Sequence, residues 1–336
     1  MSDKTDEYKL LKDLLSEFRF INKKIYMADF SITILLSWPL FFYACFNEGA
    51  YSTVLYVISI FAIYRGTIFI HEVAHFEKDI KGFKLIYNIF FGWANCFPAY
   101  LYTPHFFHHG KKTYGTAKDP EYLFMKNQSK YSIYSPIILA FFVPFYHFAR
   151  FAVLPLFYFI LPEQVLVKIF KKYSTLVMNI NYERRIRYDY ELNEMKKNDL
   201  LCALYKWLPL ILVYLGYLPF KTIYLYFFAL YIAMLLNMYR AKFNHRYENP
   251  NIPMSDMDQL LENVTVEGGI ISELWSPTSL RFHTIHHVVQ DIPYHNLKKA
   301  HQKLKRELPK GHPYFKTIES SFLSAWKSHY QMLKNT

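Results

Sequence analysis

The chain has 336 residues and a net charge of +12, from 39 Lys and Arg against 27 Asp and Glu. Hydrophobic residues make up 52% of the chain and aromatic residues 20%, an aromatic load typical of proteins with side chains at the membrane–water interface. The basic residues lie in loops beside apolar segments, which favours membrane orientation over nucleic acid binding as the reason for the positive charge.

The N-terminal third predicts a cytosolic segment followed by a membrane hairpin. Residues 1–26 are polar, lack a cleavable signal peptide, and are typical of an amphipathic helix lying near the membrane. The apolar runs 28–46 and 50–70 each approach the roughly 20 residues that a bilayer-crossing helix needs. The turn between them, Asn47-Glu48-Gly49, has no Lys or Arg, so we expect it outside the cell and both hairpin ends in the cytosol.

The middle of the chain predicts segments that do not cross the membrane in a simple way. Residues 83–102 are apolar but contain Asn and Pro, which indicates an interfacial or re-entrant segment. Residues 131–161 are apolar and contain three prolines, a pattern that fits either a helical hairpin or interfacial helices. Residues 162–199 are rich in Lys and Arg and predict a cytosolic section.

A second membrane hairpin is predicted at about 200–239, followed by a polar C-terminal region with helical patterns near 296–307 and 316–333. The sequence therefore predicts an all-α polytopic membrane protein with about four transmembrane helices in two hairpins, at about 28–70 and 200–239. Interfacial or re-entrant helices and a cytosolic histidine-rich cap complete it. We expect residues 27–336 to form a single membrane domain, with the cap built from 71–130, 162–199 and 240–336.

The sequence contains three histidine clusters: His71-Glu-Val-Ala-His75, His105-Phe-Phe-His108-His109 and His283-Thr-Ile-His286-His287. With 14 histidines in the chain, one H-x-x-H-H pattern is expected about 0.02 times by chance, and it occurs twice. Imidazole is the commonest protein metal ligand, and residues three and four apart on a helix share a face. The clusters therefore predict a metal site, and adjacent histidines that point in different directions can serve two metals.

The three clusters resemble the histidine boxes of the membrane fatty acid desaturase and hydroxylase superfamily in type, order and spacing. The resemblance covers about residues 60 to 326, and the stretch 281–301 is similar to bacterial-type members. It implies that two iron ions are bound by histidines at the cytosolic ends of four membrane helices. Those implied ligands are His71, His75, His105, His108, His109, His283, His286 and His287. A further implied ligand, at the end of the fourth membrane helix, matches His245.

The sequence departs from the pattern of the superfamily at one position. In acyl-CoA desaturases an Asn one helical turn before the last ligand holds a metal-bound water, and Ala241 stands at that position here. We expect no catalytic residue beyond the metal ligands. Carboxylates that accept hydrogen bonds from the ligand rings would orient them, and the candidates are Glu72, Asp119, Glu121, Glu273 and Asp291. His295, close after the third box, is a further candidate for such a contact.

The resemblance implies an O2-dependent enzyme of lipid metabolism. Our first hypothesis is a fatty acyl or lipid desaturase that introduces a C=C bond. Our second is a lipid or acyl-chain hydroxylase on the same scaffold. The chain has only three scattered cysteines and no haem-binding motif, so we expect electrons from a separate donor such as cytochrome b5 or a ferredoxin. The other expected partners are a lipid or acyl-chain substrate and the membrane, with the active site on the cytosolic side and no nucleic acid.

A third hypothesis comes from a different class of enzyme. His71-Glu72-Val-Ala-His75 is also the H-E-x-x-H motif of zinc metalloproteases, with Glu72 as the general base. That interpretation needs one further protein ligand and leaves most of the second and third clusters without a role.

Overall fold

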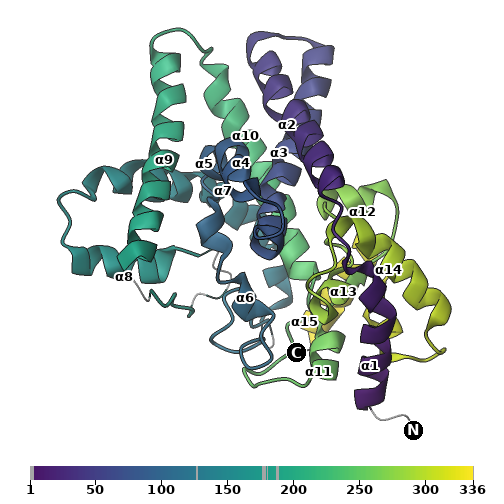
Figure 1. Cartoon of the computed structure of the whole chain (residues 1–336). Coiled ribbons are helices and arrows are strands. Elements are labelled where there is room, and N and C mark those ends of the chain that lie inside the picture. Colours follow the sequence, from purple (N-terminus) through teal and green to yellow (C-terminus); the bar gives the residue numbers. More distant parts are fainter. Residues whose placement is uncertain (1–3, 126–127, 176–178, 180, 187–188, 336) are drawn as a thin grey trace.

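The computed structural model describes residues 4–125, 128–175, 179, 181–186 and 189–335. The predicted segments 1–26, 71–130, 162–199 and 240–336 each contain at least one residue outside this set. The described residues are mainly helical, as predicted, and Figure 1 shows tall hairpins above a cap of shorter elements. The cap carries a single two-stranded parallel sheet among the described residues.

The first hairpin consists of α2 (Lys23–Phe46) and α3 (Ala50–Phe76), which pack along their length. The second consists of α9 (Asp189–Tyr214) and α10 (Lys221–Phe243). In Figure 1 the connecting loops of both hairpins lie at the same end of the molecule. The two predicted hairpins are therefore confirmed, although α9 begins about ten residues before the predicted apolar run.

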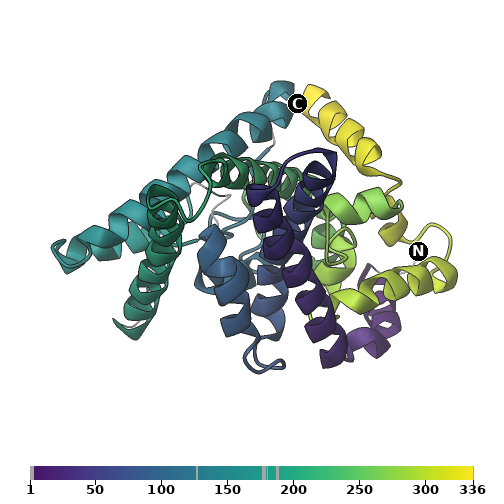
Figure 2. The ribbon, with the colours of Figure 1, turned by 90° about the horizontal axis from the view of Figure 1, so that it is seen from above.

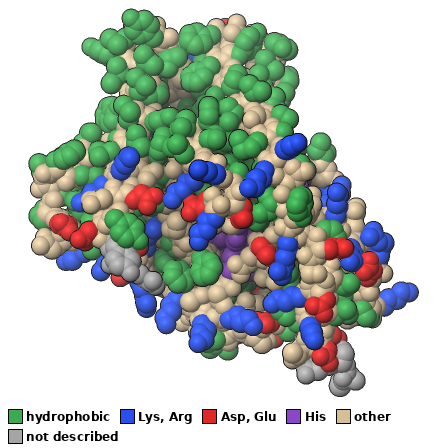
Figure 3. Space-filling model, in the orientation of Figure 1, with side chains coloured by type: hydrophobic (Ala, Val, Ile, Leu, Met, Phe, Trp, Pro, Cys, Tyr) green, Lys and Arg blue, Asp and Glu red, His purple; other side chains and the backbone are tan. Residues whose placement is uncertain are grey.

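Four helical segments are long and apolar enough to cross a membrane: Lys23–Phe46, Ala50–Phe76, Lys130–Phe157 and Lys221–Phe243. Helix α9 falls outside this set because charged side chains, Lys197, Asp199 and Lys206, extend into its apolar part. Apolar side chains cover the hairpins in Figure 3, whereas Lys, Arg, Asp and Glu gather on the cap. This distribution is that of an integral membrane protein.

The segment 131–161 is not a hairpin. A 3-10 helix (Lys130–Tyr134), α7 (Ser135–Phe148), a π-helical turn (Ala149–Val153) and a second 3-10 helix (Leu154–Phe157) follow one another as one continuous helical segment. Figure 2 shows it as a long rod running across the molecule. Pro136 and Pro155 lie in first turns, where Pro is tolerated, and Pro144 lies inside α7. Helix α7 packs against α10, and α8 (Glu163–Tyr173) follows.

Residues 83–102 form short pieces rather than a spanning helix. They are α4 (Phe83–Tyr87), a π-helical turn (Asn88–Gly92), α5 (Trp93–Asn95) and a 3-10 helix (Ala99–Tyr102). The backbone groups that the breaks release find partners: the Trp38 indole donates to the Phe90 carbonyl, and the Asn88 side chain accepts from the Ala99 amide. The segment enters beside α3 and returns to α6 (His105–His108), as expected for a re-entrant element.

The C-terminal region builds the cap around the helix ends. Its elements are α11 (Asp256–Glu262), β1 (Thr265–Val266), α12 (Ile270–Trp275), α13 (His283–Val288), α14 (Tyr294–Glu307), a 3-10 helix (Pro313–Thr317), β2 (Ile318–Glu319) and α15 (Phe322–Asn335). Strand β1 pairs with β2, with Thr265 opposite Ile318. Residues 316–321 were predicted as the start of a helix, but they form the end of the 3-10 helix and this strand, so α15 begins at Phe322.

The N-terminal helix α1 (Lys4–Leu15) corrects one expectation. Its apolar residues Leu11 and Leu15 are fully buried against the cap, where α1 contacts α14 and α11. In Figure 1 this helix lies at the end of the molecule far from the hairpin loops. The apolar face that suggested a helix lying near the membrane is therefore used for packing within the protein.

Candidate metal centre

Nine histidines converge at the junction between the hairpins and the cap. They form two groups, and within each group one ligand atom from every residue lies within 4.8 Å of the others. The first group is His71, His75, His105, His109 and His286, and the second is His108, His245, His283 and His287. These are the nine histidines that the sequence analysis proposed as ligands, and the adjacent pairs His108–His109 and His286–His287 divide between the two groups.

Local structure explains how each cluster reaches the junction. His71 and His75 lie one turn apart at the end of α3, so both rings project from the same face. Helix α6 consists of little more than the second cluster, and α13 begins at His283. His245 follows the end of α10 and forms an antiparallel bridge with Asn263, while Thr265 bridges Phe282. These two bridges hold His245 beside the start of α13.

The ring nitrogens face one another at distances that suit a shared metal ion. In the first group the Nε2 atom of His109 lies 2.9 Å from that of His105 and 3.1 Å from that of His286. In the second group His245 Nε2 lies 3.1 Å from His108 Nε2 and 2.9 Å from His283 Nε2. Ligand nitrogens about 2.1 Å from a metal and at right angles are about 3.0 Å apart. Both groups therefore fit a bound metal ion.

Several of these nitrogens have no other partner. Both ring nitrogens of His71 and the Nε2 atom of His75 are buried without a hydrogen bond among the described residues. Burying an unpartnered polar group costs free energy, and native proteins satisfy most such groups. A metal ion in the first group would take one nitrogen from each of these two rings.

Burial keeps the cap histidines in the form that binds metals. It lowers the pKa of the imidazoles of His105, His109, His283, His286 and His287 well below the ordinary value, and neighbouring histidines lower it further. The pKa of His245 is lowered in the same way. His108 differs: burial lowers its pKa, but the nearby carboxylates of Asp119 and Glu121 together leave the pKa above its ordinary value. Neutral imidazole is the ligand form, so no proton has to be displaced from most of the site.

Two carboxylates orient ligand rings through their second nitrogen. Asp119 accepts a hydrogen bond from His108 Nδ1, which lies 2.9 Å from both carboxylate oxygens. Glu121 accepts one from His105 Nδ1 at 2.6 Å. Such contacts fix the tautomer and the ring orientation of a metal-binding histidine. Both residues were among the predicted carboxylates.

The remaining residues that were predicted to contact the ligand histidines mostly have other partners. Glu72 is buried and accepts a hydrogen bond from Tyr26, with its second oxygen 3.5 Å from His71 Nδ1. Glu273 instead pairs with Arg281 at 3.1 Å, and Asp291 pairs with Arg19 on the surface at 3.5 Å. His295 accepts from the Asn22 amide and contacts Asn296. Within the described part of the chain, Glu273, Asp291 and His295 make no hydrogen bond or ion pair with the nine histidines, because the fold directs them to other partners.

Two residues that sequence reasoning did not select position His245. The hydroxyl of Tyr114 lies 3.0 Å from His245 Nδ1, and His329 Nε2 donates to the His245 carbonyl at 2.6 Å. His329 comes from α15, far along the chain, so only the tertiary structure brings it to this loop. The sequence carries no signal for either contact beyond the presence of the side chains.

Replacement of Asp119 by Asn should lower metal affinity or turnover 10- to 100-fold, about the effect of losing a partner that orients a ligand. Asn keeps the size of the side chain and one acceptor oxygen, but it removes the charge that holds the His108 ring. The effect is measured as metal content per chain and as the initial rate of product formation. Asp256→Asn, which breaks only the pair with Lys111, is the matched control. Equal metal content and rate in the two variants would contradict an orienting role for Asp119.

Comparison with known proteins agrees with this geometry. The family model described as fatty acid desaturase matches residues 49–318, which contain all nine histidines. The chain is 30% identical over 329 residues to a ceramide hydroxylase of Caulobacter vibrioides, covering 94% of this chain and 90% of the relative. No solved structure matches this chain significantly.

Proposed function

This chain belongs to the fatty acid desaturase family, and we propose that it uses two irons and dioxygen to oxidise an unactivated C–H bond of a membrane lipid. Family and relative together make it an oxidoreductase of lipid metabolism of the desaturase or hydroxylase type. The observation that carries the proposal is the pair of histidine groups at the junction of hairpins and cap. Iron suits such imidazole sites.

The chain's own residues would hold and orient the metals. The nine histidines provide neutral nitrogen ligands, and Asp119 and Glu121 fix two of the rings. Two irons, when bound, would pass electrons from the donor to dioxygen and would supply Lewis acidity. The site lies where the membrane helices end, so a lipid can keep its chains between the helices while its polar head remains in water.

We propose hydroxylation as the reaction and a ceramide-like lipid as the substrate class. The support is the ceramide hydroxylase, which aligns with nearly the whole chain rather than with the histidine boxes alone. Desaturation, our first hypothesis from the sequence, stays a prediction, because the same metal site serves both reactions. In either case we expect a separate electron donor, such as cytochrome b5 or a ferredoxin.

Lipid mass spectrometry tests the function. We expect host cells that express the protein to accumulate lipids that have gained one oxygen atom, whereas cells expressing His108→Ala do not. Lipids that have instead lost two hydrogen atoms would identify a desaturase. An unchanged lipid profile, with the protein inserted and loaded with metal and with ceramide and a donor supplied, would contradict the proposal.

We also propose that both termini and the metal site face the cytosol. The turn Asn47-Glu48-Gly49 lacks Lys and Arg, whereas basic residues gather on the cap. Topology reporters at each terminus and at Asn47 measure the orientation. We expect cytosolic signals from both termini and an external signal from Asn47. The reverse pattern would refute this orientation.

A further inference from the structure

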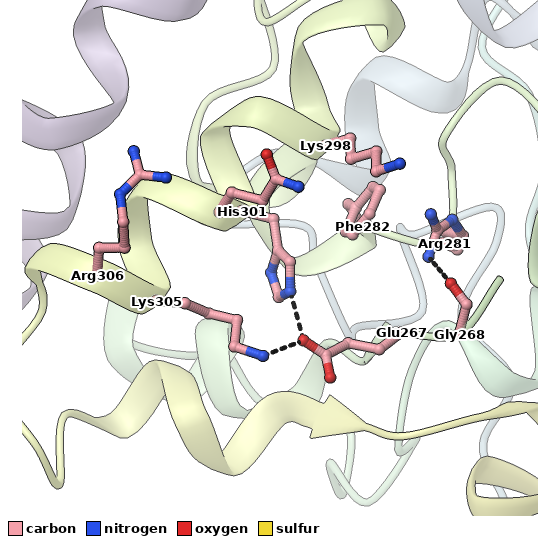
Figure 4. Close-up of a pocket in the computed structure, with 9 residues that line it drawn as sticks. Glu267, Gly268, Arg281, Phe282, Lys298, His301, Lys305 and Arg306 are labelled. Atoms are coloured by element: carbon pink, nitrogen blue, oxygen red, sulfur yellow. Dashed lines mark hydrogen bonds and ion pairs between the residues drawn. The ribbon is translucent and has the colours of Figure 1, made fainter.

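A basic pocket lies on the cap, separate from the histidine groups. Its volume is about 580 Å3, and Figure 4 shows it between α14 and the segment around Gly268. Lys298, His301 and Lys305 line it from one face of α14, because they are three and four residues apart. Arg281 and Phe282, just before the ligand His283, form the opposite wall.

The pocket has more positively charged side chains than carboxylates to pair with them. Glu267 contacts both His301, at 2.8 Å, and Lys305, at 2.6 Å, so its charge is neutralised at the floor. Arg281 pairs with Glu273. Lys298 and Arg306 also line the pocket, and neither has an ion pair with another described residue. The pocket thus presents two uncompensated positive charges, which suits a ligand with a negatively charged group.

A short apolar helix adjoins the pocket. Helix α12 begins two residues after Gly268, and its Ile270 and Ile271 are 77% and 73% exposed. Glu273, on the same helix, ties α12 to the pocket wall through Arg281. Nothing among the described residues covers these two isoleucines.

Helix α12 lies at the depth of the membrane helices. The hydroxyl of Tyr64 in α3 donates to the Trp275 carbonyl at the end of α12, at 2.7 Å. Tyr64 precedes His71 by seven residues, which is about 10 Å along a helix axis, and helical side chains point back toward the N-terminus. For α3 that direction leads away from the histidines and into the membrane. An exposed apolar pair on a helix anchored at this depth is suited to contact with the bilayer.

We propose that this pocket binds the phosphate-bearing head group of an anionic membrane phospholipid, whose acyl chains lie against α12. Lys298 and Arg306 supply the charge, and Ile270 and Ile271 supply the apolar contact. An acidic protein would use the charge but leave the isoleucines unexplained, whereas a lipid satisfies both. The same arrangement of an apolar helix in the interface and a basic pocket beside it is how proteins recognise anionic lipids.

Native mass spectrometry of the full-length protein in detergent tests the proposal, with phosphatidylglycerol, phosphatidylcholine and inorganic phosphate as probes. We expect one phosphatidylglycerol to be retained per chain and phosphatidylcholine to be lost. Each basic residue near an anionic surface strengthens binding about five-fold, so Lys298→Gln with Arg306→Gln should weaken retention about 30-fold. The matched control removes the same charge from the exposed Lys112 and Lys118.

A second variant, Ile270→Ser with Ile271→Ser, keeps the charge and removes the apolar contact, and it should also weaken retention. Several outcomes would overturn the proposal: unchanged retention in the Lys298 and Arg306 variant, an equal loss in the Lys112 and Lys118 control, or equal retention of phosphatidylcholine. Binding of inorganic phosphate as tight as that of the lipid would overturn the lipid assignment. The readout is lipid retention, so the result does not depend on the proposed enzymatic activity.

Discussion

Replacement of His108, His109, His286 or His287 by Ala is expected to abolish lipid oxidation while the protein still inserts into the membrane. His109 and His286 belong to the first histidine group, and His108 and His287 belong to the second. Each replacement removes one nitrogen ligand from a group. Loss of a residue that merely orients a ligand costs 10- to 100-fold, so loss of a ligand itself should cost more.

The four variants also test whether both groups hold a metal. Metal content per chain should fall in every variant, and product should fall below detection. The four-membered second group has fewer ligands to spare, so His108→Ala and His287→Ala should lose more metal than His109→Ala and His286→Ala. Membrane insertion and expression level, measured on the same preparations, separate loss of a ligand from loss of the fold.

His312→Ala is the control for these variants. His312 is buried like the ligands, but its ring contacts the Glu7 carbonyl and the Tyr314 amide rather than another histidine of the two groups. Its activity should stay close to that of the unmodified protein. Near-normal activity in any two of the four ligand variants would refute the assignment of the histidines as metal ligands.

The membrane hairpins could be predicted because they depend on local pattern, whereas the convergence of all nine histidines was implied by the resemblance to the desaturase superfamily. An apolar run of the right length, such as 50–70, indicates a membrane helix wherever it occurs. Cluster spacing places His71 and His75 on one face of a helix before any tertiary structure is known. The metal-binding role of the nine residues stays a prediction, and it rests on the nitrogen distances within the two groups.

Local pattern could not show which of the candidate carboxylates contact a ligand histidine. Asp119 and Glu273 are both acidic residues near histidine clusters in the sequence, yet of the two only Asp119 contacts a ligand ring. The difference is made by the loop at 115–121, where the Gly115 and Glu121 amides donate to Asp119 and turn its carboxylate inward. Contacts between distant parts of the chain, such as that of His329 with His245, depend on packing that no local pattern records.

The N-terminal helix α1 also shows that a local pattern does not reveal tertiary contacts. Its amphipathic pattern predicts a buried apolar face but does not say what covers it. Packing of Leu11 and Leu15 against the cap uses that face. The exposed isoleucines of α12 lie in a segment too short for a periodicity to be recognised, and no described residue covers them.

The last prediction separates a di-iron oxidase from a zinc protease. In a zinc protease Glu72 would activate the attacking water, and general-base catalysis contributes about 10²- to 10⁴-fold, so Glu72→Gln would lose nearly all activity. In a di-iron oxidase we expect the lipid product to be retained in Glu72→Gln. Gln has the size of Glu and can still accept the hydrogen bond from Tyr26.

The structure favours a di-iron oxidase, in which Glu72→Gln retains the lipid product. Glu72 is only 3% exposed, and one of its oxygens is engaged by Tyr26, so it is poorly placed to serve as a general base for an incoming peptide. His71 and His75 share their group with His105, His109 and His286, which is more nitrogen ligands than the three protein ligands of a catalytic zinc site. The second group of four histidines would have no role in a protease.

One preparation provides both measurements, by elemental analysis followed by assay of the variant. We expect about two irons per chain, as the two histidine groups imply, little zinc, and a lipid product that persists in Glu72→Gln. One zinc per chain without iron, together with peptide cleavage that disappears in Glu72→Gln, would overturn the oxidase assignment. Because Glu72 lies beside His71 without completing either group, the variant removes the proposed base of the protease and leaves every proposed iron ligand in place.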